Sequence, residues 1–583
     1  MKQLAILRDY FRANIWRYVI GIFCLIFVDS MQLVTPKLTG TVADLLQEGN
    51  LDSAVLLKYA AIIVGLAVLT AAGRYGWRMY VMGSARRLDY YLRNKLFIKL
   101  QTLSAGFFNK HKTGDLMAHS TNDIQAVRMA FGQGIMMITD AAFLSIMTIV
   151  IMSKTISWKL TAVALLPLPL LVFVSVFFGR QIHHRFRAVQ ESFSRLTDKT
   201  QENLAGIRVV KSFVQEKPEI RLFEEYNMHN VNMNMKLVRI WGLFFPLIQF
   251  ISALSYIAVI GYGGILATNS EITLGGFVSF LSYLGLLIWP IMAIGWVINI
   301  FQRGMASLER LNAIFAEIPD VADHENTLPV EHIDGSISIK NLTFAYPGAS
   351  VPALQDINIE LPQGKTLAII GRTGSGKTTL INLLLRMYNP PAGSVFVDGY
   401  DVNLLPLNTL REGIGCVPQD NFLFSATVRE NIGFAGTDYS DAEIENAARI
   451  AQVYDNIVDF PDGFETMVGE RGVTLSGGQK QRISIARALI KNPKVLILDD
   501  SLSAVDTQTE EAILQGLKSF GAGRTNIIVS HRVSSIRHAD EIIVLDGGKI
   551  VERGNHDSLL HNKGLYHDLY QKQLLEEEIA KVD

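Results

Sequence analysis

Two neighbouring carboxylates follow one of the most apolar stretches in the C-terminal half of the chain. The segment KVLILDDSLSAVD, residues 494–506, runs through aliphatic side chains into Asp499 and Asp500. A buried strand that ends in Asp commonly marks a magnesium-nucleotide site, because Mg²⁺ prefers oxygen ligands. Hydrolysis often uses the longer Glu at the second position. The pair therefore predicts nucleotide binding. It leaves open whether Asp500 is a weakened catalytic base for ATP hydrolysis or whether another chain supplies the hydrolytic residues.

A glycine-rich loop earlier in the chain supplies the phosphate-binding half of such a site. Residues Gly371–Thr378 fit the pattern G-x-x-x-x-G-K-[ST], between an apolar strand (366–370) and a predicted helix (379–385). Its glycines let backbone amides wrap the phosphates, and the helix N-terminus adds its positive end. In this pattern Lys377 reaches the β- and γ-phosphates and Thr378 binds Mg²⁺. The other loop residues that we predict to bind nucleotide are Gly371, Thr373, Gly374, Ser375, Gly376 and Thr379.

A second glycine-rich turn lies between these two motifs, in TLSGGQKQRISIARALI, residues 474–490. Ser476, Gly477 and Gly478 precede a helical pattern, so backbone amides gather beside another helix start. One nucleotide does not need two phosphate-binding turns of this kind. The segment is therefore either a glycine-rich turn or a surface that faces a nucleotide held by a second domain.

The motifs occupy only the C-terminal part of a long chain. The chain has 583 residues, of which 49% are hydrophobic and 19% charged, and its formal net charge is −1. This composition excludes a disordered or nucleic-acid-binding class, and it indicates a membrane protein without a strongly charged partner. Cys24 and Cys416 lie far apart in segments of different character, so we predict no disulfide.

Six long apolar runs precede residue 305, and beyond residue 335 the pattern becomes that of a soluble α/β protein. Each run reaches the ~20 residues that a helix needs to cross a bilayer. The predicted membrane segments are residues 17–39, 56–82, 131–153, 157–179, 240–266 and 274–303.

Charge decides the orientation of these segments. Lys and Arg gather in the connections 84–130 and 180–239, whereas the alternate connections are short and nearly free of them. The positive-inside rule then places both long connections and both termini in the cytoplasm. We expect membrane helices that continue beyond the bilayer and turn back at short tips, with breaks at Gly114-Asp115 and Ala205-Gly206.

Four regions follow from this division. Residues 1–15 are predicted to form an amphipathic elbow helix at the membrane interface, with a simple cytoplasmic extension as the alternative. Residues 16–315 form the membrane domain with its two long cytoplasmic loops. The polar segment 316–335, with two prolines, is the linker, and residues 336–583 form the nucleotide-binding domain.

Leu475–Gln479, LSGGQ, resembles the signature of ATP-binding cassette (ABC) proteins. Six membrane segments followed by one cassette resemble one half of an exporter of this family, so the resemblance covers essentially the whole chain. TGDLMAHSTND and ENLAGIRVVKSF are similar to the family's intracellular loops, whose tips would be coupling helices that dock on the cassettes. The other matching elements are Tyr346 (adenine stacking), Gln419 (Q-loop), VGERG at 468–472, SAVD at 503–506 (D-loop) and His531 (switch histidine).

The resemblance implies a fold and a mechanism. The fold is a polytopic α-helical membrane domain with six transmembrane helices, type I/IV ABC exporter-like, fused to an α/β P-loop nucleotide-binding domain. Two cassettes sandwich two ATP molecules with Mg²⁺, each between one chain's Walker A loop and the other chain's signature, Leu475, Ser476, Gly477, Gly478 and Gln479. ATP would close the cassettes and switch the membrane cavity between inward- and outward-facing states. Asp500 and His531 would be catalytic, and Thr378, Gln419 and Asp499 would hold the metal.

Asp499 matches the Walker B Asp of the family. In the family pattern the next residue is Glu, whereas in this chain it is Asp500. Asp is shorter by one methylene, and a misplacement of about 1 Å costs on the order of 100-fold in rate. The site made by this chain's Walker motifs is therefore predicted to bind ATP but hydrolyse it slowly, while its signature completes a partner's catalytic site. This combination resembles the degenerate-site subunit of bacterial heterodimeric multidrug exporters of the Bacillus type. We favour a heterodimer, with a homodimer as the alternative.

The transported substrate is less well determined by sequence. Polar residues within membrane segments are costly in lipid and are expected to face the bundle or a cavity, although helix–helix hydrogen bonds explain them equally well. Small amphipathic drugs, antibiotics included, would suit such a cavity. Its candidate lining residues are Asp29, Asp140, Gln249, Trp296 and Asn299.

Three functions remain in comparison. The first is half of an ATP-driven exporter of drugs or similar hydrophobic compounds. The second is a dedicated lipid or peptide exporter of the same build. The third is a regulatory ATP-binding subunit that gates a partner, which Asp500 favours and the intact signature and His531 oppose. In each case the chain would be multi-pass in a cell membrane, and a bacterial plasma membrane fits best.

Overall fold

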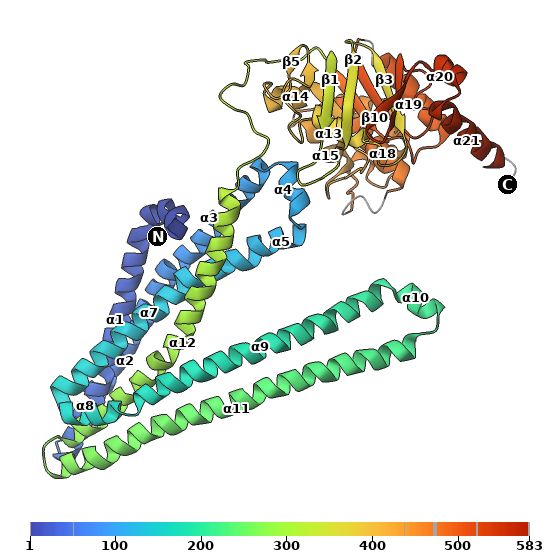
Figure 1. Cartoon of the computed structure of the whole chain (residues 1–583). Coiled ribbons are helices and arrows are strands. Elements are labelled where there is room, and N and C mark those ends of the chain that lie inside the picture. The colour runs from blue at the N-terminus through green and yellow to red at the C-terminus, as the bar shows by residue number, and fades with distance from the viewer. Residues whose placement is uncertain (1, 51, 437, 470–474, 521–522, 581–583) are drawn as a thin grey trace. The chain divides into compact units, whose positions relative to one another are not determined.

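The computed structural model describes residues 2–50, 52–436, 438–469, 475–520 and 523–580 (Figure 1). The chain divides into two compact units. The membrane unit contains residues 1–101 and 113–317, and the nucleotide unit contains residues 102–112 and 318–583. Residues 317–336, between the last helix of the first unit and the first strand of the second, hold neither helix nor strand.

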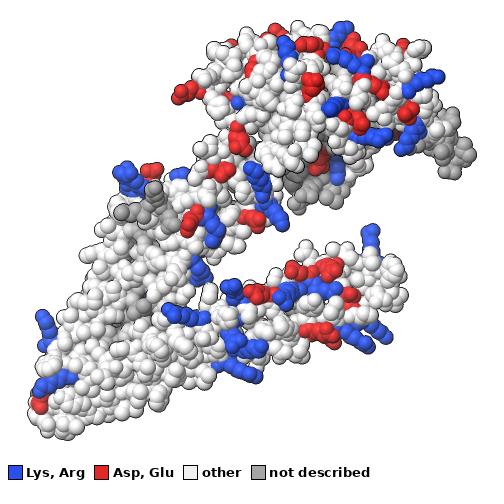
Figure 2. Space-filling view, viewed as in Figure 1, with Lys and Arg blue, Asp and Glu red and all other residues white. Residues whose placement is uncertain are grey.

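The membrane unit confirms the six predicted membrane segments. Six of its described helices are long and apolar enough to cross a bilayer. In Figure 2 the surface over their middle portions carries almost no charge, whereas Lys and Arg gather toward the ends. The spans are Leu4–Gln47, Ser53–Thr102, Thr113–Ile156, Trp158–Ala205, Glu216–Thr268 and Leu274–Ala316.

The last two spans are single α-helices, the first begins with a 3₁₀ turn, and the fourth is divided into two α-helices. The second and third spans contain short π-helical turns. The bounds are η1 Lys2–Leu7, α1 Arg8–Gln47, α2 Ser53–Trp77, η2 Arg78–Met82, α3 Gly83–Thr102, α5 Thr113–Ala118, η3 His119–Asp123, α6 Ile124–Met129, η4 Ala130–Gly134, α7 Ile135–Ile151, η5 Met152–Ile156, α8 Trp158–Leu165, α9 Leu168–Ala205, α10 Ile207–Ser212, α11 Glu216–Thr268 and α12 Leu274–Ala316.

The N-terminal segment differs in detail from a free elbow helix. A 3₁₀ turn leads directly into α1, and its apolar residues pack on neighbouring helices. Leu7 is fully buried, and the Tyr10 hydroxyl donates to the Ser84 carbonyl. Its predicted position at a membrane interface stays a prediction.

The membrane helices form two groups. Helices α1, α2, α7 and α12 pack together, while α9 and α11 run side by side as a hairpin that separates from this group along most of its length (Figure 1). The break predicted at Ala205-Gly206 is confirmed, because α9 ends at Ala205 and α10 begins at Ile207. None of the side chains of α10 is buried.

The break predicted at Gly114-Asp115 is wrong. Both residues lie inside α5, and the chain turns earlier, on either side of α4 Ala105–Lys110. The polar residues that follow form an internal network rather than a turn. The carboxylate of Asp123 accepts hydrogen bonds from Ser307 Oγ at 2.9 Å and Arg310 Nε at 3.1 Å, and it lies 2.6 Å from His119 Nδ1. This network holds α12 against the helices of the first long connection between membrane segments.

The nucleotide unit has the predicted α/β architecture. A six-stranded sheet has the order β10-β9-β3-β8-β7-β6 and is parallel except for β10, and an antiparallel four-stranded sheet has the order β2-β1-β4-β5. The strands are β1 Ile337–Phe344, β2 Leu354–Leu361, β3 Thr366–Gly371, β4 Val395–Val397, β5 Tyr400–Asp401, β6 Ile414–Val417, β7 Val495–Asp499, β8 Thr525–Val529, β9 Glu541–Asp546 and β10 Lys549–Gly554.

Helices cover the parallel sheet, and three clusters of buried side chains lie in this unit. The first core joins side chains of both sheets with α13, the second packs α15, α16, α18 and α19 against β7, and the third packs α20 and α21 against β3 and β9. The helices are α13 Lys377–Leu384, α14 Leu407–Gly413, α15 Val428–Ile432, α16 Asp441–Ile450, α17 Tyr454–Val458, α18 Gly477–Ile490, α19 Thr507–Phe520, α20 His556–Asn562 and α21 Leu565–Ala580.

Candidate nucleotide-binding site

The phosphate loop follows the central strand β3, which pairs in parallel with β8 and β9. A Cβ on Gly371 would collide with the backbone of Leu545, so only glycine lets the loop leave the sheet here. Gly374 and Gly376 have φ of +81° and +103°, a region that costs side-chain-bearing residues energy. Gly376 is the N-cap of α13, so the loop amides and the start of that helix face the same space.

Lys377 is held at the base of this loop. Its ammonium donates to the carbonyls of Gly371 at 2.9 Å and Arg372 at 2.8 Å. The side chain is buried, and burial lowers the pKa of Lys377, an effect that the nearby Asp499 and Asp500 oppose. These contacts fix the ammonium between the loop and the two carboxylates, where a phosphate would meet it.

Asp499 ends β7, next to the phosphate loop. Its side chain is 3% exposed. Burial raises the pKa of Asp499, while a hydrogen bond with Thr378 and the charges of Lys377 and His531 act in the opposite direction. The Thr378–Asp499 contact places a hydroxyl and a carboxylate side by side. These oxygen donors suit Mg²⁺, and a cation there would compensate the buried charge.

Asp500 has a defined backbone position. Its φ is +48°, a left-handed conformation that Asp tolerates better than most residues. The Asp500 N–H donates to the Val529 carbonyl at 2.9 Å, and the Asp500 carbonyl accepts from Ser503 Oγ at 3.0 Å. The backbone is therefore tied to the neighbouring strand, and the length of the side chain decides how far the carboxylate reaches.

One cavity of about 310 Å³ brings the predicted site residues together. Gly371 lies at the strand end beside it rather than in its lining. The cavity is lined by Tyr346, Ala353, Thr373, Gly374, Ser375, Gly376, Lys377, Thr378, Thr379, Gln419, Asp499, Asp500 and His531. Segments more than a hundred residues apart thus meet at the carboxyl ends of β3 and β7, where nucleotides bind in sheets of this type.

Tyr346 and Gln419 also line a larger neighbouring cavity of about 1070 Å³. Tyr346 donates its hydroxyl to Thr379 Oγ1 at 3.1 Å and packs edge-to-face on Tyr388. Tyr388 in turn accepts a hydrogen bond from Asn109 Nδ2 of α4 at 2.5 Å. The helix α4, from the connection between the second and third membrane spans, is therefore connected to the nucleotide site through Tyr388.

The signature residues do not line this cavity. Ser476 is the N-cap of α18: its hydroxyl accepts from the Gln479 N–H at 3.2 Å, and the Gln479 side chain accepts from the Ser476 N–H at 3.0 Å. A Cβ on Gly478 would lie 2.9 Å from the Ala504 carbonyl oxygen, while one on Gly477 would make an ordinary contact. Leu475 packs on the second core. In VGERG, residues 470–472 lie outside the described residues.

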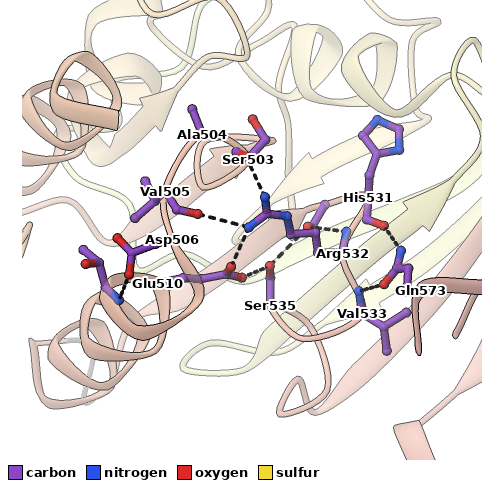
Figure 3. Close-up of polar contacts among 12 residues, drawn as sticks. Ser503, Ala504, Val505, Asp506, Glu510, His531, Arg532, Val533, Ser535 and Gln573 are labelled. Carbon is purple, nitrogen blue, oxygen red and sulfur yellow. Dashed lines mark hydrogen bonds and ion pairs between the residues drawn. The ribbon is translucent and has the colours of Figure 1, made fainter. Parts of the chain in front are cut away.

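Sequence reasoning missed the residues that tie the motifs to one another. Gln481 donates to Ser503 Oγ at 3.1 Å and accepts from the Ala504 N–H at 3.0 Å, which joins α18 to the SAVD segment. Arg532 and Gln573 hold the segment around His531 (Figure 3). Gln481 and Arg532 lie within three residues of recognised motifs, whereas no local pattern marks Gln573.

Unlike the nucleotide-site residues, the candidate substrate residues of the membrane unit do not line one described cavity. Asp29 is fully buried beside Asp140, and among the described side chains no donor reaches either of its oxygens. Gln249 is exposed and Trp296 is half-exposed, and Asn299 donates to the Gly295 carbonyl of its own helix at 2.9 Å. A shared substrate cavity stays a prediction. Cys24 and Cys416 are both free thiols.

Known proteins resemble the chain along its whole length. Residues 18–291 match the family described as the ABC transporter transmembrane region, and residues 354–503 match the ABC transporter family. A probable multidrug resistance ABC transporter ATP-binding/permease protein, YheI of Bacillus subtilis, is 43% identical over 97% of each chain. The multidrug resistance-like ATP-binding protein MdlA of Escherichia coli is 40% identical over 99% of this chain and 97% of its own.

A solved structure supports the same architecture. The structure of a bacterial Atm1-family ABC exporter with ATP bound superposes with a TM-score of 0.79 and 27% sequence identity. The match covers 98% of this chain and 99% of the other. The likeness therefore extends over both the membrane unit and the nucleotide unit.

Proposed function

The chain belongs to the ABC transporter family, and from this premise we propose that it is one of two chains of an ATP-driven exporter in a bacterial plasma membrane. Its own Walker site binds ATP and hydrolyses it slowly, and its signature completes the catalytic site of a different partner chain. The substrates are amphipathic drugs or similar hydrophobic compounds. Both termini lie in the cytoplasm.

Asp500 is the observation that carries this proposal. It lines the cavity with Lys377, Thr378 and His531, so it is the carboxylate placed to orient water against a bound γ-phosphate. Its backbone is fixed to Val529, so a shorter side chain is not recovered by a shift of the strand. Relative to Glu, the carboxylate is withdrawn by about 1–1.5 Å, and about 1 Å of misplacement costs on the order of 100-fold.

The remaining site residues have defined roles in this proposal. Lys377 and the loop amides bind the phosphates, Tyr346 stacks on the base, and His531 contacts the γ-phosphate. Thr378, Gln419 and Asp499 line one cavity and offer the hydroxyl, amide and carboxylate oxygens that would hold Mg²⁺. Bound Mg²⁺ would neutralise charge on the β- and γ-phosphate oxygens.

Two features support a second chain. Ser476 and Gly478 present a capped helix start that is separate from the cavity lined by this chain's Walker residues. The tip around α10 exposes apolar side chains, with Val209 61% and Phe213 70% exposed. Exposed apolar groups of this size favour a protein partner, here the cassette of the second chain.

The drug-export part of the proposal rests on the multidrug-type relatives and on the buried polar residues of the membrane unit. Asp29, beside Asp140 within apolar helices, is the kind of intramembrane carboxylate that marks a pathway for cationic groups. A dedicated lipid exporter would share the fold and the nucleotide site. Transport of cationic dyes separates the two, because a lipid exporter would leave them untouched.

The test compares the chain purified alone with the chain purified with a candidate partner, in ATPase and dye-transport assays. We expect little turnover by the lone chain and robust, dye-stimulated turnover by the pair. Robust turnover by the lone chain would overturn the heterodimer. ATP binding that gates transport without hydrolysis at either site would identify a regulatory subunit instead.

Asp500→Glu then tests the degenerate site itself. The change should raise the hydrolysis of ATP bound to this chain by about 10- to 100-fold. Asp546→Glu is the matched control, because Asp546 is an exposed residue at the end of β9 in the same sheet and does not line the cavity. No gain from Asp500→Glu would mean that the site is impaired elsewhere.

A further inference from the structure

The backbone around His531 is held from the side opposite its imidazole. Gln573, on the C-terminal helix α21, donates through Nε2 to the His531 carbonyl and accepts at Oε1 from the Val533 N–H at 2.8 Å. Figure 3 shows the Gln573 amide facing the backbone while the His531 ring points away from it. One side chain thus binds a carbonyl and an amide two residues apart, which defines the orientation of the intervening peptide planes.

The same segment is also bound to the SAVD segment. The Arg532 guanidinium donates to the carbonyls of Ser503 at 2.8 Å and Val505 at 3.1 Å. It also pairs with Glu510 at 3.1 Å, and that carboxylate, which is buried, accepts from the Ser535 hydroxyl as well. Residues 531–535 are therefore fixed on one side by α19 and the SAVD segment. On the other side Gln573 supplies the hydrogen bonds that Figure 3 draws.

The position of α21 is set by packing, so Gln573 is attached to a rigid support. Tyr566, near the start of the helix, is fully buried in a cluster with Val533 and Ile536. Leu569 and Tyr570 pack against the same cluster. The same cluster contains Ala368 and Ile370 of β3, so α21 packs on the strand before the phosphate loop as well as on the segment after His531. Gln573 is the side chain of α21 that hydrogen-bonds directly to the His531 backbone.

We propose that Gln573 is a positioning residue for His531, through which the C-terminal helix α21 controls hydrolysis at this chain's nucleotide site. The inference rests on the proposed role of His531 at the γ-phosphate. Loss of the Gln573 contacts lets the switch backbone rotate, so the imidazole leaves its place in the cavity while the ATP-binding residues stay where they are. Nucleotide binding and hydrolysis are thereby separable at this residue.

The kinetic test uses the full-length dimer in the Asp500→Glu background, because that change should make this site hydrolyse. Gln573→Ala should lower the kcat for hydrolysis of the ATP bound to this chain about tenfold and leave the KM for that ATP within twofold, since misplacement of the catalytic group affects the transition state alone. Gln571→Ala is the control: it is an exposed glutamine on the same helix, and it should change neither value. Gln573→Glu keeps the acceptor for Val533 but loses the donor to His531, and it should also lower kcat.

A double-mutant cycle assigns the effect to His531. If Gln573 acts through that side chain, Gln573→Ala should cause no further loss once His531→Ala is present. Full turnover of the His531→Ala variant would contradict the proposed role of His531 itself. A large loss with His531→Ala but none with Gln573→Ala would overturn the positioning role alone.

A measurement that needs no hydrolysis checks the contact directly. Hydrogen–deuterium exchange of the Val533 amide should be faster in Gln573→Ala than in the unchanged chain, and unchanged in Gln571→Ala. Unaltered protection of Val533 would overturn the inference whatever the turnover. Faster exchange with full turnover would show that the contact exists but does not position a catalytic group.

Discussion

The chain contains two glycine-rich helix starts that look alike in sequence and differ in their surroundings. The loop before α13 lies among Asp499, Asp500 and His531 in one cavity, and its lysine is buried between carbonyls and carboxylates. The turn before α18 is closed by a capping box between Ser476 and Gln479, and it packs on the SAVD segment. The first lies in a cavity that also contains two carboxylates, whereas the second lies outside that cavity. This difference favours a site completed by two chains.

Of the predicted effects, the largest is the loss of ATP binding to this chain when Lys377 of the first glycine-rich helix start is replaced. Lys377→Ala should weaken ATP binding to this chain by about 100-fold, because a buried ammonium that would contact the phosphates is removed. Photo-crosslinking of an azido-ATP analogue to this chain measures the effect separately from the partner. Lys365→Ala is the control, since Lys365 is exposed and its ammonium pairs with Asp540 at 2.9 Å. Unchanged labelling of Lys377→Ala would mean that ATP binds elsewhere.

Gly478→Ala, in the second glycine-rich helix start, should lower turnover of the dimer without weakening ATP binding to this chain. The added methyl group would lie 2.9 Å from the Ala504 carbonyl oxygen, so the turn must shift away from the surface that faces the partner's ATP. We expect turnover of the assembled dimer to fall about tenfold or more with azido-ATP labelling of this chain unchanged. Gly433→Ala is the control, because its nearest neighbours would lie 3.9–4.0 Å away. A parallel loss of labelling would contradict the division between the two glycine-rich starts.

Ser476 separates the structural role of the signature from its proposed contact with nucleotide. Ser476→Ala removes the cap hydroxyl and should lower the free energy of unfolding of the nucleotide unit by about 1 kcal/mol. Ser476→Thr keeps a capping hydroxyl and should melt within a degree or two of the original chain. Thermal unfolding of both variants gives the comparison. Equal melting of Ala and Thr variants would mean that the capping box adds nothing to stability.

The smallest predicted effect is on thermal stability when Asp499 is replaced. The burial of Asp499 determines whether stability rises or falls. Because the pKa of Asp499 is raised in the folded chain, the folded state binds more protons than the unfolded state between the two pKa values. Its contribution to stability is therefore present below the ordinary pKa and lost as pH rises through the folded value. Asp499→Asn should melt a few degrees higher than the original chain at neutral pH without nucleotide.

Added Mg²⁺ and ATP distinguish this burial effect from a general gain in stability. The original chain should be stabilised by Mg²⁺-ATP, because the cation compensates the buried carboxylate, and Asp499→Asn should gain less. Asp540→Asn is a useful control, since Asp540 is exposed and its pKa is lowered: partial burial raises it, but hydrogen bonds from Lys365 and the Thr366 N–H outweigh that effect. A melting gain with Asp540→Asn as large as with Asp499→Asn would contradict the assignment to burial.

The sequence predicted well wherever the structure depends on neighbours along the chain. The six apolar runs became six long helices because each run alone exceeds the width of a bilayer. The glycines at 374 and 376 have the positive φ that a phosphate loop needs, and the helix begins at Lys377, two residues before its predicted start at 379. At Gly114-Asp115 the same reasoning failed, because packing of the first long connection on α12 overrides two weak helix breakers.

What the sequence by itself determined is the chemistry: a phosphate loop, a strand that ends in two carboxylates, a signature and six membrane segments, each encoded within about 20 residues. Tertiary structure alone decided which of these residues share a cavity and which side chains hold them there. Gln573 lies 42 residues from His531, and Asn109 lies 279 residues from Tyr388, yet each pair is joined by a hydrogen bond. Contacts at such separations depend on how sheets and helices pack, and a single sequence carries no periodic signal for them.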